Sequence, residues 1–242
     1  MIIMLLDRAY SEQQLSEELH LDLRNIESKV WPRILSSCKA SALRLYNIKL
    51  KTLDGIESLI ETKTLELEWA KKVEELLPVF KMQELESLSV YDFPKLENID
   101  GIGSLSKLKT LNLSGSRGAL TPKLCIKSIV PVSKIPNLTS FSLANASLGD
   151  DDVMHLAKCK QLQHLNLSNQ FDRVQLAYLA KHLNEQLVKP LESHITSNIK
   201  CKTCGEYQAM FIGRSMPMLC HICNDKRFKR HVDEFNQLVS DA

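Results

Sequence analysis

Pairs of apolar residues separated by a single residue return at a nearly constant interval along most of the chain. The successive intervals are 22, 22, 23, 23, 30 and 24 residues. Alternate side chains of a strand point to opposite faces, so each pair predicts a short strand with two side chains in a core and the middle one facing solvent. The predicted strand centres are residues 21–23, 43–45, 65–67, 88–90, 111–113, 141–143 and 165–167.

The later units add a third apolar position, three residues before the strand centre, at Leu85, Leu108, Leu138 and Leu162. This arrangement resembles the leucine-rich repeat family, over roughly residues 18–187. Segments 53–59 and 99–105 are similar to the convex half of the short bacterial repeats of internalins. The resemblance implies an α/β solenoid of about seven repeats, whose parallel strands line a concave sheet.

Two features depart from the family pattern. The family carries asparagine three positions after the second strand leucine, whereas here the asparagines come one residue earlier, at Asn25, Asn47, Asn145 and Asn169. Either a local bulge shifts the asparagine ladder, or apolar packing holds the turns together. In addition, the 30-residue interval predicts a loop insertion within residues 117–136, which are interrupted by glycine and proline.

Both ends of a solenoid need a cap, because each exposes a sheet edge and an open core. Ser11 and Gln14 have the spacing of a capping box for a short helix, and residues 1–6 are expected to join that N-terminal cap rather than form a signal peptide. An amphipathic stretch from Val174 to Leu187 predicts the closing helix. We therefore expect a solenoid over 1–187, a linker over 188–199 and a separate module over 200–242.

The solvent-facing residues of the predicted sheet differ between its two halves. The first half carries charged and aromatic side chains, whereas the second half is small and neutral. Large amphipathic side chains dominate protein contacts, so the first half is the predicted site for a protein partner. The candidate binding residues are Arg44, Tyr46, Glu66, Glu68, Trp69, Tyr91 and Asp92. An alternative for the charges is that Asp22, Arg44 and Glu66 form a cross-strand ladder that only holds register.

Four of the seven cysteines form two C-x-x-C pairs separated by fifteen residues. Two such pairs across a hairpin provide four thiolates in a tetrahedron, which suits a structural zinc ion and leaves no open position for substrate. The predicted ligands are Cys201, Cys204, Cys220 and Cys223. The segment resembles a zinc ribbon with strands over 207–212 and 216–219. Because Cys204-Gly205 is also similar to the rubredoxin knuckle, iron is an alternative metal, and a redox dithiol is an alternative without metal.

Composition narrows the function classes only a little. The net charge of +2 selects no partner class, and no apolar run approaches the length of a membrane span. An odd number of cysteines without a secretory leader predicts a reducing compartment, the cytoplasm. A basic cluster over 226–231 opens a C-terminal helix, whose apolar face we expect to pack on the ribbon or on the array.

These patterns predict a non-enzymatic protein-interaction module whose concave face binds a protein partner. An inhibitor or immunity-type protein would be one form of it. The alternative is a nucleic-acid-binding protein that acts through the zinc ribbon and its basic helix. An enzyme is not expected, because the sequence shows no phosphate loop, nucleophile elbow or zinc-binding histidine pair, and no small-molecule substrate or membrane partner is indicated.

Overall fold

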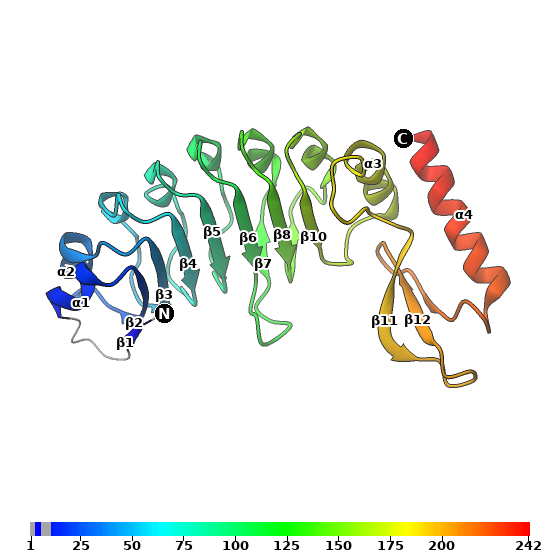
Figure 1. Ribbon diagram of the computed structural model, residues 1–242, viewed down its shortest axis with the longest axis horizontal. Coiled ribbons are helices and arrows are strands. Elements are labelled where there is room, and N and C mark those ends of the chain that lie inside the picture. Colours follow the sequence, from blue (N-terminus) through cyan, green and yellow to red (C-terminus); the bar gives the residue numbers. More distant parts are fainter. Residues whose placement is uncertain (1–2, 6–10) are drawn as a thin grey trace.

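A single parallel sheet runs through most of the computed structural model, which describes residues 3–5 and 11–242. Over these residues eight strands pair in the order β1-β2-β3-β4-β5-β6-β8-β10, side by side as one array (Figure 1). Their bounds are Ile3–Leu5, His20–Ile26, Ala42–Ile48, Thr64–Glu68, Ser87–Tyr91, Thr110–Ser114, Ser140–Ala144 and His164–Leu167. All seven predicted strands are present, and the fold is the expected leucine-rich repeat solenoid. The extra strand, β1, lies where we expect the N-terminal cap; the rest of that opening segment is outside the described residues.

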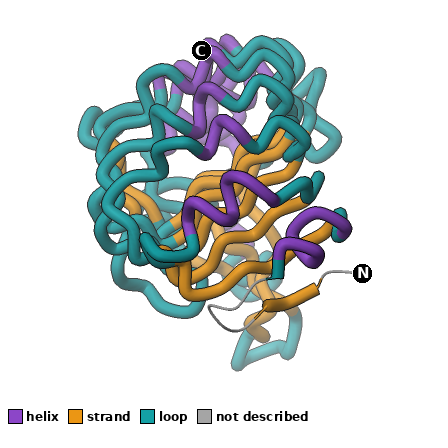
Figure 2. Tube along the Cα trace, turned by 90° about the vertical axis from the view of Figure 1, so that its left-hand side faces the viewer, coloured by secondary structure: helices purple, strands orange, loops and turns teal. Residues whose placement is uncertain are grey.

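The register of the strands follows the leucine pattern without slippage. Leu21 pairs with Leu43, and Leu43 with Leu65. The same row continues through Leu88, Leu111, Phe141 and Leu165. Side chains of this row and of the row two residues later are buried in one continuous core, except Leu165 and Leu167 of β10, which are partly buried against it. Each fully buried leucine contributes about 2 kcal/mol. Figure 2, which looks along the array, shows the strands stacked behind one another.

Short helical turns connect the strands on the far side of the core. Two of them are α-helices, α1 (Glu12–Glu17) and α2 (Trp31–Ser37), and α1 begins with the predicted capping box of Ser11 and Gln14. The others are single 3-10 turns: η1 (Ile56–Ser58), η2 (Val79–Lys81), η3 (Ile102–Ser104), η4 (Val130–Lys134) and η5 (Met154–Lys158). Gly55 precedes η1 with a φ of 89°, a conformation that disfavours any residue with a Cβ. Val73, Leu77 and Phe80 recur at helical spacing, but Leu77 is 50% exposed and this segment forms only the 3-10 turn η2.

The displaced asparagines have a backbone cause. The residue just beyond the repeat strand centre adopts the left-handed conformation in most repeats, at Asn25, Asn47, Trp69, Asp92 and Asn145. Asparagine and aspartate tolerate this conformation better than other side chains with a Cβ. Asn47 Nδ2 donates to Asn25 Oδ1 at 2.6 Å, which links neighbouring turns. One hydrogen bond between shifted asparagines therefore joins the first turns, whereas Asn145 and Asn169 bond to the insertion loop and to the C-terminal module.

The insertion after β6 contains a strand of its own. β7 (Leu124–Ile126) pairs in parallel with β9 (Ala146–Leu148), beside the main sheet. The base of the preceding loop is held by Asn145, whose Nδ2 donates to the carbonyl oxygens of Ser116 and Ala119 at 3.1 Å each. The insertion is therefore anchored to the array rather than extended from it as a free loop.

Beyond β10 the chain forms the closing helix and then a small antiparallel sheet. The helix, α3, spans Arg173–Leu183, and the sheet joins β11 (His194–Lys200), β12 (Tyr207–Phe211) and β13 (Met218–Leu219). The last element is α4 (Asp225–Asp241). Most of β11 falls inside the expected linker of residues 188–199, so that stretch is a strand from His194 onward. Its side chains are largely exposed and show no apolar alternation, which explains why the sequence pattern does not reveal it.

The C-terminal module packs against the end of the array. Asn169 donates to the Phe211 carbonyl at 3.0 Å and accepts from the Gly213 amide at 2.6 Å. Arg214 forms an ion pair with Asp151 at 2.6 Å, and the Phe235 side chain of α4 is buried in the core of the array. Figure 1 shows α4 beside α3 at this end. The apolar face of α4 therefore packs on the array as expected. Phe228 of this helix also contacts Phe211 of the small sheet, with 5.1 Å between the ring centroids.

Within the described part of the chain, no helix is both long and apolar enough to cross a bilayer.

Asn169→Ala is expected to loosen the attachment of the module. The change removes one donor and one acceptor that hold the β12–β13 turn, at a cost of about 1–3 kcal/mol. Amide hydrogen exchange in residues 207–219 should accelerate, while exchange in β3 to β5 stays unchanged. Asn198→Ala, at an exposed position of β11, is the matched control. Equal exchange in both variants would show that the apolar contacts of α4 alone hold the module.

Candidate functional site

The predicted binding residues lie together on the solvent-facing side of β3, β4 and β5. We call these seven residues, Arg44, Tyr46, Glu66, Glu68, Trp69, Tyr91 and Asp92, the N-terminal patch. Strand pairing places Tyr46 opposite Glu68 and Glu68 opposite Tyr91, so the three form one row. Arg44 and Glu66 form the row before it, and Trp69 and Asp92 follow at the strand ends. A register slip of one residue would have turned these side chains into the core.

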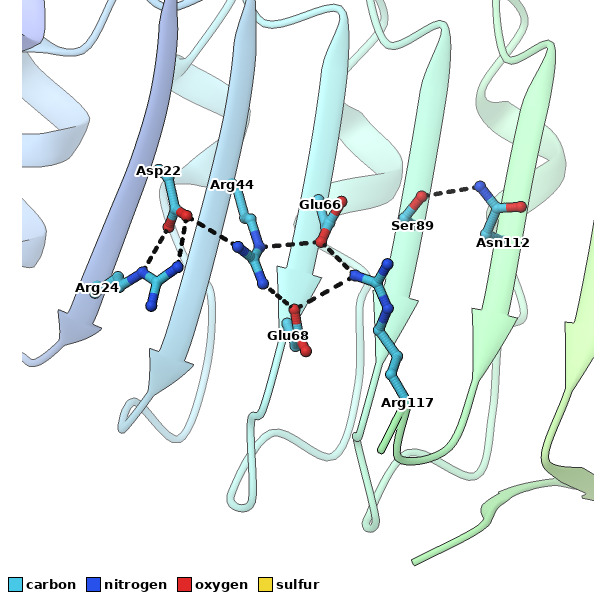
Figure 3. A network of polar contacts seen from close by, with 8 residues as sticks. All are labelled: Asp22, Arg24, Arg44, Glu66, Glu68, Ser89, Asn112 and Arg117. Carbon is cyan, nitrogen blue, oxygen red and sulfur yellow. Dashed lines mark hydrogen bonds and ion pairs between the residues drawn. The ribbon is translucent and has the colours of Figure 1, made fainter. Parts of the chain in front are cut away.

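Arg44 is the centre of a charge network on this surface (Figure 3). Its guanidinium contacts Asp22 at 2.9 Å on one side and Glu66 at 3.0 Å on the other, and it also donates to Glu68. The Asp22 side chain is only 4% exposed and is paired a second time by Arg24 at 3.0 Å. The cross-strand charge ladder considered as the alternative for these charges is thus present, and it connects three neighbouring repeats.

Arg117 joins this network from the insertion, and no strand pattern indicates it. Its guanidinium reaches across β5 to Glu66 at 3.0 Å and Glu68 at 3.6 Å. On the way it lies over the Tyr91 ring, 4.4 Å from the centroid. The only sequence signal for this contact is the enlarged interval that predicts the insertion, which does not say where the loop points.

The aromatic side chains of the patch are partly buried and are flanked by cations. The Tyr46 and Trp69 rings lie 5.6 Å apart. The Arg24 guanidinium lies 4.9 Å from the Tyr46 ring, and the Lys71 ammonium 5.2 Å from the Trp69 ring. Trp69 also has a φ of 60°. The left-handed conformation is unfavourable for a bulky side chain, so the backbone is strained at the residue with the largest ring of the patch.

Asp92 adds a carboxylate that is incompletely satisfied. Its Oδ1 is buried and accepts no hydrogen bond from the described residues. Burial raises the pKa of Asp92 above its ordinary value, the nearby Lys71 opposes the rise, and Glu68 adds to it. The folded protein therefore holds this carboxylate at a cost in stability.

The second half of the sheet is simpler. Asn112 donates to Ser89 at 3.0 Å, and Asn166 donates to Ser142 at 3.1 Å. These short polar ladders hold register without any charge. A depression of about 610 Å³ lies between Tyr91 and the insertion loop, and a second one of about 470 Å³ lies over β2 to β4. Arg117 lines both depressions.

The four predicted metal ligands come together at the tip of the C-terminal module. All four sulfur atoms lie within 4.8 Å of one another, with Cys201 to Cys223 at 3.8 Å and Cys204 to Cys220 at 3.4 Å. Metal–sulfur bonds of about 2.3 Å in a tetrahedron separate sulfur atoms by about 3.8 Å. A disulfide needs about 2.0 Å. The arrangement can therefore bind a metal ion, and all seven cysteines of the chain are free thiols.

The backbone of each C-x-x-C segment folds into a similar turn. The amide of Gly205 donates to the Cys201 carbonyl, and the amide of Asn224 donates to the Cys220 carbonyl, both at 2.9 Å. Gly205 has a φ of 81°, which glycine adopts without strain. Backbone hydrogen bonds from Cys204 and Thr203 lower the pKa of the Cys201 thiol to about 6.

The Cys223 thiol is harder to ionise because of its neighbours. A hydrogen bond shared with Cys204, together with the neighbouring sulfur atoms, raises the pKa of Cys223 to about 12. Several thiolates at this spacing repel one another, so they ionise together only when a cation neutralises them. This chemistry fits a metal site with four sulfur ligands.

Part of the basic start of α4 is paired within its own helix. Lys229 contacts Asp225 at 3.1 Å, and Arg230 contacts Glu234 at 3.6 Å. His231 also contacts Glu234, at 3.0 Å, and does not belong to the cysteine cluster.

Comparison with known proteins gives partial structural likeness only. No protein-family model and no curated protein matches the chain. Internalin C2 from Listeria monocytogenes is 17% identical over 62% of this chain and 63% of its own, with a TM-score of 0.46. A leucine-rich repeat protein from Leptospira interrogans is 15% identical over 74% of this chain and 56% of its own, with a TM-score of 0.42. The chain thus spans less than two thirds of either protein, and its fold is established by its own strand order and register.

Asp92→Asn is expected to stabilise the protein at neutral pH. The folded-state pKa is raised, so the carboxylate subtracts stability above that pKa and ceases to do so once it is protonated. The gain, at most about 1 kcal/mol for a partly exposed group, should shrink as pH falls through the raised pKa. Urea unfolding at several pH values measures it, with the exposed Asp233→Asn as control. A loss of stability at neutral pH would mean that attraction to Lys71 outweighs burial.

Proposed function

We propose that this protein is a non-enzymatic interaction module that binds a protein partner through the N-terminal patch. The observation that supports this most is the strained, partly exposed Trp69 beside the Tyr46 ring. A bulky aromatic residue in a left-handed position costs stability, and asparagine occupies the equivalent position in other repeats. Contact with a partner would explain why tryptophan stands there, since tryptophan, tyrosine and arginine dominate binding at protein interfaces.

The shape of the patch also favours a protein over a small molecule. Its residues lie along three adjacent strands, on an exposed sheet surface rather than inside an enclosed cavity. Small ligands require concave sites that bury most of their surface, whereas protein interfaces are broad. An inhibitor or immunity-type protein, which covers part of another protein, is one form that this function takes.

The second part of the proposal is that the cysteine cluster holds one structural zinc ion in a ribbon-like module. Four sulfur ligands complete a tetrahedron, which leaves no position for a substrate. The module has few large buried side chains of its own, so metal binding would supply part of its folding free energy. Free thiols at this spacing fit a reducing compartment such as the cytoplasm. With the metal bound, the folded module would cover the C-terminal end of the array and so close the solenoid.

Nucleic-acid binding through α4 is the less favoured function. Lys229 and Arg230 each face a carboxylate on the same helix, which reduces the positive field available to phosphate. Salt-dependent binding of RNA or DNA by the full chain, abolished by changing these two residues, would support this alternative instead.

Trp69→Ala and Tyr91→Ala are expected to weaken partner binding at least about tenfold each, as hot-spot residues do. Both side chains are partly exposed, so the midpoint of thermal unfolding should change little. Affinity capture with the full chain from native lysate identifies the partner, and titration of the purified partner measures the dissociation constant. Tyr207→Ala, an exposed tyrosine of the C-terminal module, is the control. Unchanged affinity in both patch variants, with normal folding, would contradict the proposed site.

Elemental analysis of the purified protein is expected to give about one zinc ion per chain. Cys204→Ser should abolish stoichiometric zinc and increase proteolysis of residues 194–242, because the module loses its metal-derived folding energy. Cys125→Ser changes a free cysteine outside the cluster and should retain the metal. Iron in place of zinc would correct the identity of the ion, while a metal-free, protease-resistant wild-type protein would disprove the metal site.

A further inference from the structure

Arg117 contacts a residue much farther away in the sequence than any other member of the charge network does. The contacts of Arg44 join neighbouring repeats, with sequence separations of 22 residues to Asp22 and 24 residues to Glu68. Arg117 is 51 residues from Glu66 and passes over the intervening strand β5 to reach it. A contact of this kind does not set the register of adjacent strands, because it skips one of them.

The ladder is complete without Arg117. Glu66 and Glu68 both already contact Arg44, and Asp22 is paired by Arg24 and Arg44. The Arg117 side chain is 51% exposed, compared with 28% for Arg44. An exposed ion pair of this kind contributes little to stability. Arg117 is therefore the member of the network that is most easily displaced.

Removal of Arg117 would leave a negatively charged recess. The remaining network has three carboxylates, Asp22, Glu66 and Glu68, against the two guanidinium groups of Arg24 and Arg44, so one negative charge is in excess. Asp92, just beyond β5, interacts with the nearby Lys71 and so adds no net charge to this recess. The excess negative charge favours a cationic group at this place.

The position that Arg117 occupies has the features of an arginine receptor. Glu66 accepts a hydrogen bond from the guanidinium, Glu68 forms an ion pair with it at 3.6 Å, and the Tyr91 ring lies under it at 4.4 Å. A planar guanidinium can stack on a ring and pair with carboxylates at the same time, which the compact ammonium of lysine does less well. The two depressions on the sheet surface, of about 470 and 610 Å³, share Arg117 as a lining residue. A chain that follows the sheet surface would therefore meet Arg117 between them.

The insertion allows the side chain to leave without unfolding the loop. Asn145 holds the backbone on both sides of Arg117, at Ser116 and Ala119. Rotation of the Arg117 side chain alone is enough to vacate the recess, while the backbone that carries it stays in place. The arrangement thus separates an anchored loop from a replaceable side chain.

We propose that Arg117 occupies, within the same chain, the place that an arginine of the protein partner takes on Glu66, Glu68 and Tyr91. The partner is then a protein segment that presents an arginine to the N-terminal patch and displaces Arg117. This inference rests on the proposed function, which it deepens by naming the chemistry of the partner. Arg117 competes with the partner and keeps the recess neutral when no partner is bound.

The first experiment uses a small probe and does not require the partner. N-acetyl-L-arginine amide is titrated into the full chain, and NMR follows the indole of Trp69 and the ring of Tyr91. Arg117→Ala should bind the probe about three- to tenfold more tightly than wild type, because the competing guanidinium is gone. N-acetyl-L-lysine amide should bind more weakly, and Glu68→Gln added to Arg117→Ala should abolish the gain. Lys123→Ala, a cation in the same insertion, is the matched control.

Two results would overturn the proposal. Equal binding of the probe to wild type and Arg117→Ala would show that Arg117 does not occupy an arginine site. A large fall in the unfolding midpoint of Arg117→Ala without any gain in probe binding would show that Arg117 is a structural clasp.

A second experiment separates this inference from the proposed function. With the purified partner, Arg117→Ala should raise affinity about two- to fivefold, whereas Trp69→Ala lowers it. If Trp69→Ala lowers affinity but Arg117→Ala also lowers it, the patch binds the partner and the displacement is wrong. If neither change alters partner affinity, the proposed binding site itself is wrong, whatever the probe shows.

Discussion

Equal register of the repeat strands is the constraint on which the rest of the structure depends. Leucine side chains at alternate positions must all enter the same core, and a slip of one residue would expose every one of them. The same requirement fixes the other face of the sheet. Arg44 meets Asp22 and Glu66 because Leu43 and Leu45 are buried on either side of it. The arrangement of charges on the solvent-facing side of the sheet thus follows from leucine packing on its buried side.

This dependence explains which features the sequence reveals. Apolar residues alternate within each strand, and the strands recur at a nearly constant interval. These two periods predict the strand positions and the rows of the N-terminal patch from the leucines alone. The contact of Arg117 with the patch could not be predicted, because the direction of its loop is set by the contacts of Asn145 and not by any periodicity. Strand β11 was hidden for a related reason, because it is largely exposed and pairs with β12 alone in the small sheet. Cysteine spacing indicated the cluster directly, because ligand geometry is local.

The left-handed residue at the strand ends connects local backbone chemistry to the candidate site. Where it is Asn25, Asn47 or Asn145, the side chain tolerates the conformation and ties turns or loops together. Trp69 is too bulky for the conformation, whereas Asp92 tolerates it but has a buried oxygen that accepts no hydrogen bond from the described residues. Local stability and surface chemistry therefore conflict in two successive repeats, and both lie in the N-terminal patch.

The hydrogen bonds of Asn169 to the β12–β13 turn have a consequence for the array as a whole. A solenoid is held mainly by nearest-neighbour contacts, so its terminal repeats open most readily, and unfolding can spread inward from them. The module that carries the cysteine cluster closes one of these ends. Metal binding to the module would then slow unfolding from this end. The rate at which distant strands open would depend on the concentration of an ion that they do not contact.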